Sequence, residues 1–169
     1  LTKIKNKSLT GADLYGAIFT YSNLSGVDIS NVIVDRTNFW KADLSGQDFT
    51  VISNAISYGA RFFEANLSNA NFEGVDFTPK KLFTVEFKNK ASLINSSNAH
   101  LIVNLIGEFD NISIISKEVS GNDLVLKWVI FNNFARANLE NTNFKDAGLM
   151  FAGFYSADFT NANLSGADL

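Results

Sequence analysis

The sequence predicts an all-β fold in which the chain coils around an axis filled by leucine and phenylalanine. The first observation is the spacing, because a large apolar residue recurs at every fifth position through most of the 169 residues. The second is what surrounds each of these centres: a small residue, usually alanine, stands two positions before it, and Ser, Thr, Gly or Asn follow it. The stretch from Phe134 to Leu169 holds this pattern without a break.

A period of five requires one turn in every repeat. In an extended chain the centre and the residue two before it face the same way, while the Asp or Asn between them faces the other way. Because five is odd, a turn must restore the phase after each centre, and residues such as Ser25 and Gly26 are suited to it. An α-helix does not fit, because centres five apart would rotate by about 140° per step and form no single buried stripe.

The repeated motif is Ala, then Asp or Asn, then Leu or Phe, then two variable residues. It occurs at Ala12-Asp13-Leu14, Ala42-Asp43-Leu44, Ala65-Asn66-Leu67, Ala70-Asn71-Phe72 and through the C-terminal stretch. In this motif the chain resembles the pentapeptide-repeat family. The resemblance implies that family's right-handed quadrilateral parallel β-helix, a solenoid with four pentapeptides in each coil, interrupted here by an irregular insertion. It does not imply one function, because one fold serves many functions.

The centres are the residues expected to form the core. They are Leu14, Phe19, Leu24, Phe39, Leu44, Phe49, Phe62, Leu67, Phe72 and Phe77, and then Phe134, Leu139, Phe144, Leu149, Phe154, Phe159 and Leu164. Leu82 and Phe87 keep the same spacing. The positions two before the centre are less uniform near the N-terminus, where Thr37 and Gln47 occupy them, so these coils are expected to pack less tightly.

The register predicts a single domain, residues 1–169, with two irregularities. In the N-terminal coils, 1–87, Phe49 and Phe62 are thirteen apart, which leaves about three extra residues for a corner bulge near 51–54. Residues 88–113 lose the pattern and are expected to form an insertion or a degenerate coil. The only proline, Pro79, falls just after a centre, where a corner is expected to tolerate it.

The start of the C-terminal coils, 114–169, has two interpretations. Ile114, Val119, Leu124 and Val129 are again five apart, which favours coils from about residue 114, although Lys117 and Lys127 then occupy the small-residue position. The alternative is a β-hairpin of residues 112–116 and 124–130 around Gly121-Asn122.

The sequence shows no catalytic, cofactor-binding or metal-binding motif. There is no cysteine, and the only histidine, His100, lies in the irregular segment. The Asp and Asn residues before the centres are explained by the repeat as outward-facing residues. Direct nucleic-acid binding is not expected, because 14 Lys and Arg are outnumbered by 17 Asp and Glu. No apolar run of about 18 residues is present to span a membrane.

Three aromatic residues exceed what the repeat requires. Trp40, Phe63 and Phe83 each directly follow a centre, and they are 23 and 20 residues apart. On a solenoid with a three-residue bulge they are predicted to stack on one outer face as an exposed aromatic ladder, a protein-contact patch. The alternative is that the segment 88–113 covers them. Phe131, Phe151 and Tyr155 are predicted to form a second, looser group.

The function predicted from these observations is a non-enzymatic scaffold that binds a protein partner through its rigid surface. The chain begins without Met and both ends lie in mid-repeat, which suggests part of a larger protein or an end-to-end homodimer or larger assembly. The resemblance adds one alternative, because some members of the family mimic DNA and bind DNA gyrase or topoisomerase. That alternative requires a strongly acidic continuous face, whereas the net charge here is −3.

Overall fold

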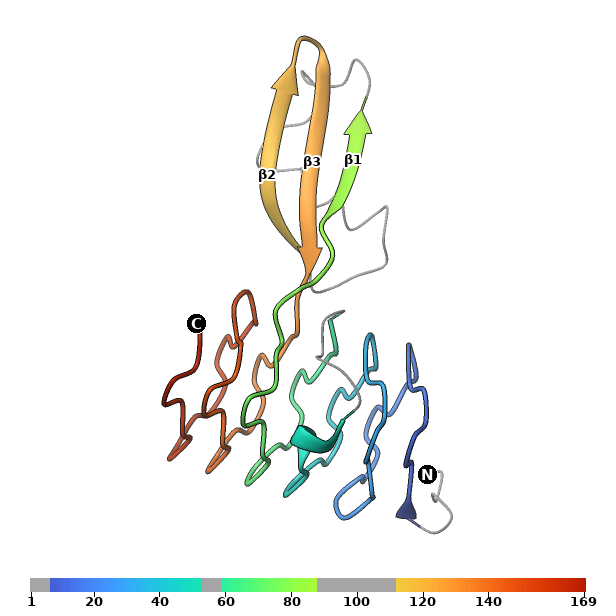
Figure 1. Cartoon of the computed structure of the whole chain (residues 1–169), viewed down its shortest axis with the longest axis vertical. Coiled ribbons are helices and arrows are strands. Elements are labelled where there is room, and N and C mark those ends of the chain that lie inside the picture. Colours follow the sequence, from blue (N-terminus) through green and yellow to red (C-terminus); the bar gives the residue numbers. More distant parts are fainter. Residues whose placement is uncertain (1–6, 53–58, 88–111) are drawn as a thin grey trace.

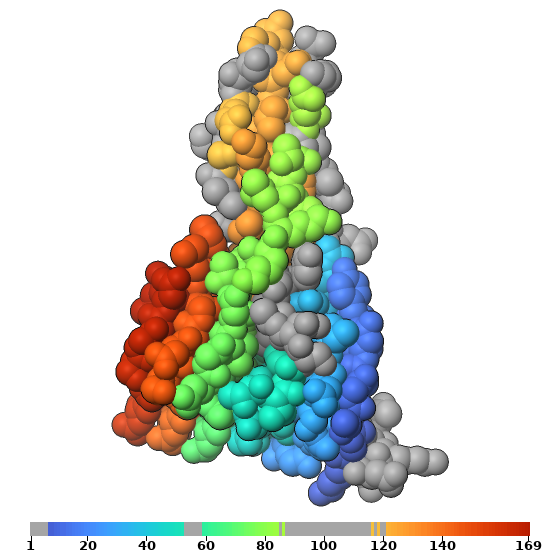
Figure 2. Space-filling model, in the orientation of Figure 1, coloured from blue at the N-terminus to red at the C-terminus, as the bar shows by residue number. Residues whose placement is uncertain are grey.

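The computed structural model consists of a stack of coils and a small three-stranded sheet that stands on it (Figure 1). It describes residues 7–52, 59–87 and 112–169. His100, most of the segment 88–113 and the second half of the bulge predicted near 51–54 lie outside the described residues. Figure 2 shows the sheet as a narrow projection on the wider coil stack.

The coils are joined by parallel bridges between residues one coil apart. In the first two coils these bridges pair Ser8 with Asp28, Asp13 with Ile33, Ile18 with Asn38 and Asn23 with Asp43. Successive bridges are five residues apart, and bridged partners are twenty apart, so each coil has four sides. The backbone hydrogen bonds run along the stack, as from Leu24 N–H to the Asp43 carbonyl at 2.8 Å. The four-sided parallel solenoid predicted from the repeat is confirmed.

Each corner is a tight turn that begins at a centre. The N–H three residues after the centre donates to the carbonyl of the centre, as from Ala42 to Phe39 at 2.9 Å. Except in the 3-10 turn after Phe49, the residue two after the centre takes a positive φ, for example 54° at Lys41 and 67° at Gly46. The Asp or Asn before the centre stabilises the same turn, because its carboxylate or amide oxygen accepts a backbone N–H, as Asp43 Oδ1 does from Ser45 at 3.1 Å.

The centres fill the axis in vertical columns. One column stacks phenylalanine rings face to face, with 5.2 Å between the ring centroids of Phe39 and Phe62 and 4.8 Å between those of Phe62 and Phe134. Rings of a second column, such as Phe72, meet the first column edge to face. The structure places thirteen of the predicted centres in the buried core, namely Leu14, Leu24, Phe39, Leu44, Phe49, Phe62, Leu67, Phe72, Phe77, Phe134, Leu139, Phe144 and Leu149. Phe19, Phe154, Phe159 and Leu164 are partly buried against it.

The position two before each centre, which we call the corner slot, faces the interior. Alanine usually fills it, but Thr37, Gln47 and Thr142 occupy it and are buried. Each donates a hydrogen bond to a backbone carbonyl of the preceding coil: Thr37 to Leu14 at 2.7 Å and Gln47 to Leu24 at 2.6 Å, for example. The looser packing expected at Thr37 and Gln47 is therefore not found, because these side chains bind the neighbouring coil.

The bridge spacings locate both irregularities. From Asn38 to Arg61 the spacing is 23, which places three extra residues between Asp48 and Arg61, next to a single 3-10 turn, η2 (Phe49–Val51). From Asn71 to Asn143 it is 72, which is one coil of twenty plus an insertion of fifty-two residues. That insertion lies between the bridged residues Asp76 and Asn133, so it begins earlier and ends later than the predicted 88–113.

Leu82 and Phe87 were wrongly predicted as centres, because the coil stops after Phe77. Leu82 is 52% exposed, and Phe87 ends strand β1. Pro79 supplies the physical reason. It stands two residues after Phe77, the position that takes a positive φ at the other described corners except the 3-10 turn after Phe49, and the proline ring holds φ near −65°. The expectation that a corner would tolerate Pro79 is wrong, since the proline prevents the turn.

The insertion contains an antiparallel sheet of order β1-β3-β2, with β1 (Phe83–Phe87), β2 (Ile112–Ser120) and β3 (Asp123–Ile130). The hairpin of β2 and β3 turns at Gly121-Asn122, with Val119 opposite Leu124 and Ile114 opposite Trp128. The hairpin interpretation is confirmed, and the prediction that coils resume at 114 is wrong. Coils resume at Asn132, where the corner slot of the next repeat begins.

The sheet has its own apolar face. Leu124, Leu126 and Trp128 alternate along β3 on the same side and are almost completely buried. The opposite side carries Lys127, which forms an ion pair with Glu118 of β2 at 2.5 Å. None of these buried β3 side chains belongs to the core cluster of the coils, so the sheet and the solenoid have separate cores.

Candidate protein-contact site

Two of the three predicted patch residues lie together on the solenoid. Trp40 and Phe63 occupy the same corner of adjacent coils, and the N–H of Lys41 donates to the Phe63 carbonyl at 3.1 Å. Phe83 is not on this corner. It lies in β1, where its ring stacks on Trp128 with a centroid distance of 5.7 Å. The prediction of one ladder is wrong for Phe83, because the corner that it would have occupied is replaced by the insertion.

The third rung of the ladder is Tyr21 instead. Its N–H donates to the Trp40 carbonyl at 3.0 Å, and the two rings tilt against each other with 5.6 Å between centroids. Tyr21 is two residues after its centre rather than one, so the position directly after each centre does not predict it. The aromatic edge therefore consists of Tyr21, Trp40 and Phe63, in three successive coils; Tyr21 is 58% and Trp40 38% exposed, and Phe63 is partly buried.

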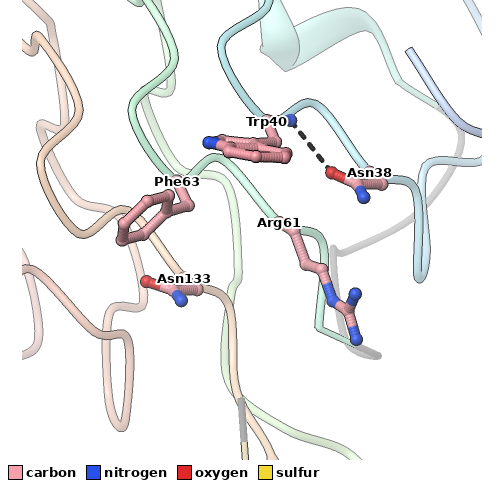
Figure 3. A pocket seen from close by; sticks show the side chains of 5 residues that line it. All are labelled: Asn38, Trp40, Arg61, Phe63 and Asn133. Atoms are coloured by element: carbon pink, nitrogen blue, oxygen red, sulfur yellow. Dashed lines mark hydrogen bonds between the residues drawn. The ribbon is translucent and has the colours of Figure 1, made fainter. Parts of the chain in front are cut away.

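A hollow of 380 Å³ opens beside Trp40 and Phe63 (Figure 3). Its other lining residues are Asn38, Arg61 and Asn133, the outward-facing residues of three consecutive coils on one side of the solenoid. We call this site the corner hollow. Its shape follows from the repeat: one side chain per coil faces outward along the flat side, and the aromatic rings stand at the adjoining corner. In the view of Figure 3 the Trp40 and Phe63 rings lie next to each other.

Charged residues hold the aromatic rings in place. Glu64 forms ion pairs with Lys41 at 3.1 Å and with Arg136 at 3.4 Å, so three successive coils are joined along this corner. The Lys41 ammonium lies 5.4 Å from the Trp40 ring centroid, and the Arg136 guanidinium lies 5.7 Å from that of Phe63. The hydrogen bond from Lys41 lowers the pKa of Glu64 and raises that of Lys41, so both stay charged at neutral pH.

The second predicted group, Phe131, Phe151 and Tyr155, is less coherent. Phe131 lies against the backbone of Gly153, where an added Cβ would stand 2.7 Å from its ring. Phe151 and Tyr155 are exposed by 47% and 75%. Tyr155 follows Phe63 along the same corner, but Ala135 separates the two, as shown by the hydrogen bond from Arg136 N–H to the Tyr155 carbonyl.

The described residues show no group of three or more His, Cys, Asp or Glu that could hold a metal ion. The Asp and Asn residues before the centres are occupied by the corner turns, as at Asp13, Asn23 and Asp158. Within the described ranges, no helix is long and apolar enough to cross a membrane.

A profile described as pentapeptide repeats matches the chain in eight copies, over residues 5–35, 52–78 and 133–169. These ranges cover more than half of the chain. The chain belongs to the pentapeptide-repeat family. The matched ranges stop at 78 and resume at 133, which agrees with the limits of the insertion in the structure. The solenoid of this pentapeptide-repeat protein is the right-handed quadrilateral β-helix expected from its sequence.

Similar solved structures are also pentapeptide repeat proteins. Rfr23 from the cyanobacterium Cyanothece 51142 is 14% identical with a TM-score of 0.34, over 97% of this chain and 88% of that chain. HetL from Nostoc sp. strain PCC 7120, involved in heterocyst differentiation regulation, is 20% identical with a TM-score of 0.28, over 95% and 67%. A protein from the Arabidopsis thaliana thylakoid lumen is 18% identical with a TM-score of 0.22, over 96% and 66%. Among curated proteins, no relative matches significantly.

Proposed function

We propose that this pentapeptide-repeat protein is a non-enzymatic scaffold that binds a partner protein through the corner hollow and the aromatic edge beside it. The observation that carries the proposal is the clustering of Tyr21, Trp40 and Phe63 on three successive coils, next to a hollow of 380 Å³. Aromatic residues are enriched at protein interfaces and dominate their binding energy. The coils hold these rings on a rigid backbone, which lowers the conformational entropy lost on binding.

The charge distribution gives no support to DNA mimicry. In the described coils, none of the bridged outward-facing pairs joins two acidic residues. Asp43 is bridged to Asn23 and Asn66, and Asp76 to Gly148. At the corner with the aromatic edge, Lys41 and Arg136 flank Glu64. A face that imitates the DNA duplex needs a continuous run of negative charge. Here each bridged aspartate is paired with a neutral residue along the stack, and basic residues flank Glu64 at the corner.

Site-specific photo-crosslinking tests the proposal. A benzophenone amino acid at position 63 replaces one aromatic ring with another and should crosslink a partner in extracts of the source cells. The same residue at position 155 is the matched control, because Tyr155 lies on the same corner two coils away and is 75% exposed. With the purified partner, Trp40→Ala should weaken binding at least about 30-fold, the effect of a hot-spot residue.

The proposal is wrong if positions 63 and 155 crosslink the same proteins equally. It is also wrong if Trp40→Ala binds the captured partner as tightly as the unaltered chain does.

A further inference from the structure

The corner of the aromatic edge carries long side chains at a position where the repeat favours small ones. At a regular corner the residue two after the centre takes a positive φ, a conformation that favours glycine and asparagine. The next corner along the chain follows this preference throughout the described coils, with Gly26, Gly46, Asn69, Asn141 and Asn161. At the corner of the aromatic edge, four successive coils hold Tyr21, Lys41, Glu64 and Arg136 instead. The backbone conformation therefore does not explain the choice of these four residues.

These four residues form a regular row along the stack, which we call the edge row. Their φ angles are 58°, 54°, 56° and 57°, so the four side chains leave the backbone in the same way. Parallel coils lie about 4.8 Å apart, which gives the row an even spacing. Its order is tyrosine, cation, anion, cation, and the rings of Trp40 and Phe63 stand directly before the cation and the anion of the two middle coils. The edge row thus joins charges of both signs to apolar surface, as protein interfaces do.

The edge row is complementary to itself when it is reversed. Consider a second copy that lies antiparallel, with the twofold axis between the coils of Lys41 and Glu64. Lys41 then faces the partner's Glu64, and Glu64 faces the partner's Lys41. Tyr21 faces the partner's Arg136, which gives a cation and an aromatic ring on opposite sides of the contact. Because both copies have the same coil spacing, these contacts stay in register over all four coils.

Other twofold arrangements of the edge row are less favourable. Two parallel copies would place each charged residue opposite its own equivalent, and an axis through the coil of Lys41 or of Glu64 would do the same to that residue. Like charges placed opposite each other across an interface are strongly unfavourable. A shift by one coil would pair Glu64 with the partner's Arg136 but would bring Lys41 opposite Ser156. Only the axis between Lys41 and Glu64 gives both residues an opposite charge.

We propose that the partner bound at the aromatic edge is a second copy of this chain, packed side by side and antiparallel. Trp40 of each copy packs on the partner's Phe63 beside the corner hollow. The inference rests on the proposed function and identifies its partner. Another corner shows why the aromatic rings matter. Glu73 and Lys145 form an ion pair between coils there at 2.7 Å, but the described positions of that corner include no aromatic residue, so the pair has no apolar surface beside it to bury.

Charge reversal tests the arrangement, because it separates pairing between copies from the Lys41–Glu64 ion pair within one chain. In Lys41→Glu both facing pairs become Glu against Glu, and in Glu64→Lys both become Lys against Lys. Each variant alone should therefore dimerise at least about tenfold more weakly than the unaltered chain. An equimolar mixture of the two variants should restore the dimer, because every Glu then faces a Lys of the other copy. The ion pair within each chain stays broken in the mixture, so a purely structural role cannot produce this rescue.

Sedimentation velocity over a series of concentrations gives the dissociation constant of each dimer. Glu73→Lys is the matched control, since it breaks an ion pair between coils on another corner and should leave the dissociation constant unchanged. A second measurement tests the register without changing any charge. With the purified chain, a benzophenone amino acid at position 63 should form a crosslink between copies at or near the partner's Trp40, whereas the same residue at position 155 should not.

Three outcomes overturn the inference. The first is a chain that stays monomeric at about 0.1 mM, where a dimer of micromolar affinity would be nearly complete. The second is a dimer that both charge-reversed variants still form alone, and the third is a mixture that dimerises no better than its components. In each case the proposed function stands if position 63 captures a different protein from extracts of the source cells. It fails together with the inference if position 63 captures nothing that position 155 does not.

Discussion

Asn132 connects the two irregular places of the solenoid. In a regular corner, the backbone N–H of the corner slot donates to the carbonyl of the preceding centre, as Ala42 does to Phe39. After Phe77 this turn is missing, and the Asn132 side chain replaces it, with its Nδ2 donating to the Phe77 carbonyl at 2.8 Å. In the coil next to it, the Ala60 N–H donates to Asn132 Oδ1 at 2.9 Å. One fully buried side chain thus satisfies two backbone groups.

We predict that Asn132→Ala strongly destabilises the fold. Alanine is the usual residue of the corner slot, so the substitution adds no steric strain. It leaves a buried carbonyl at Phe77 and a buried N–H at Ala60 without their described partners, and each loss costs about 1–3 kcal/mol. The expected decrease in the free energy of unfolding is therefore about 2–6 kcal/mol, a large part of the stability of a typical domain.

Thr142→Ala is the matched control for Asn132→Ala. Thr142 is also fully buried in a corner slot, and its hydroxyl donates to the Leu67 carbonyl at 2.9 Å. That carbonyl also accepts the Ala70 N–H at 3.0 Å, so it keeps a partner when the hydroxyl is removed. The expected cost is about 0.5–1.5 kcal/mol. Urea unfolding followed by far-UV circular dichroism compares the two variants. Equal costs within about 0.5 kcal/mol would refute the bridging role of Asn132.

Four further predictions follow from the same contacts. Phe72→Ala should cost about 3–5 kcal/mol in urea unfolding, because the Phe72 ring is fully buried and stacks on Phe49 and Phe144 at 4.3 and 5.0 Å; Tyr155→Ala, at a residue 75% exposed, should change stability by no more than about 0.5 kcal/mol. Gly46→Ala should cost about 1 kcal/mol, since φ is +67° there and an added Cβ meets nothing within 4 Å; an unchanged midpoint would show that the corner can relax. Stability should fall in acid, because hydrogen bonds from the Ser30 hydroxyl and backbone lower the pKa of Asp28, and those from Thr160 lower the pKa of Asp158. This stabilisation is complete above the ordinary carboxyl pKa of 3.8 and is lost as the pH falls through the lower folded-state value, so the urea midpoint of Asp28→Asn/Asp158→Asn should depend less on pH than that of the unaltered chain. Replacing residues 79–131 with one glycine should give a folded, continuous solenoid, because Phe77 and Phe134 then stand five residues apart; a chain that shows no β circular dichroism would contradict the insertion limits.

The sequence predicts the solenoid well because its signal is repeated many times. Phe72 is identified as a core residue by its neighbours at intervals of five, and the structure buries it completely. Such a register depends on the covalent spacing alone, so single irregular residues do not obscure it. The role of the Asp and Asn before each centre was only partly predicted. They face outward as expected, but the reason for their residue type is the turn N–H that they accept, which is visible only in the atomic structure.

The limits of the insertion could not be predicted from spacing, because a strand can imitate the period by chance. Ile114, Val119, Leu124 and Val129 are five apart, yet they belong to antiparallel strands whose pairing shifts between Ile114 and Ser116. The residues at the corner slot distinguish the two cases. A corner slot faces the interior, so Lys117 and Lys127 do not fit it.

The same error misplaced the third aromatic rung. The spacing predicts Phe83 in the ladder because it is twenty residues after Phe63, a distance that is meaningful only while the coil continues. The position directly after a centre does not predict Tyr21, because at a corner with positive φ the residue two after the centre also reaches the same edge. An aromatic edge of this solenoid can therefore be formed by either of the two residues that follow a centre at each corner.

An insertion in a solenoid must break one turn without leaving its backbone groups unpaired, and this chain achieves that with two residues. Pro79 stops the turn after Phe77, because its ring cannot take the positive φ found two residues after the other described centres except Phe49. Asn132 then supplies from its side chain the donor that the broken turn would have supplied from the backbone. In related sequences, a proline two residues after a centre should therefore mark the start of an insertion, and a polar residue such as asparagine in a later corner slot should mark its end. The spacing of apolar residues alone does not locate these ends.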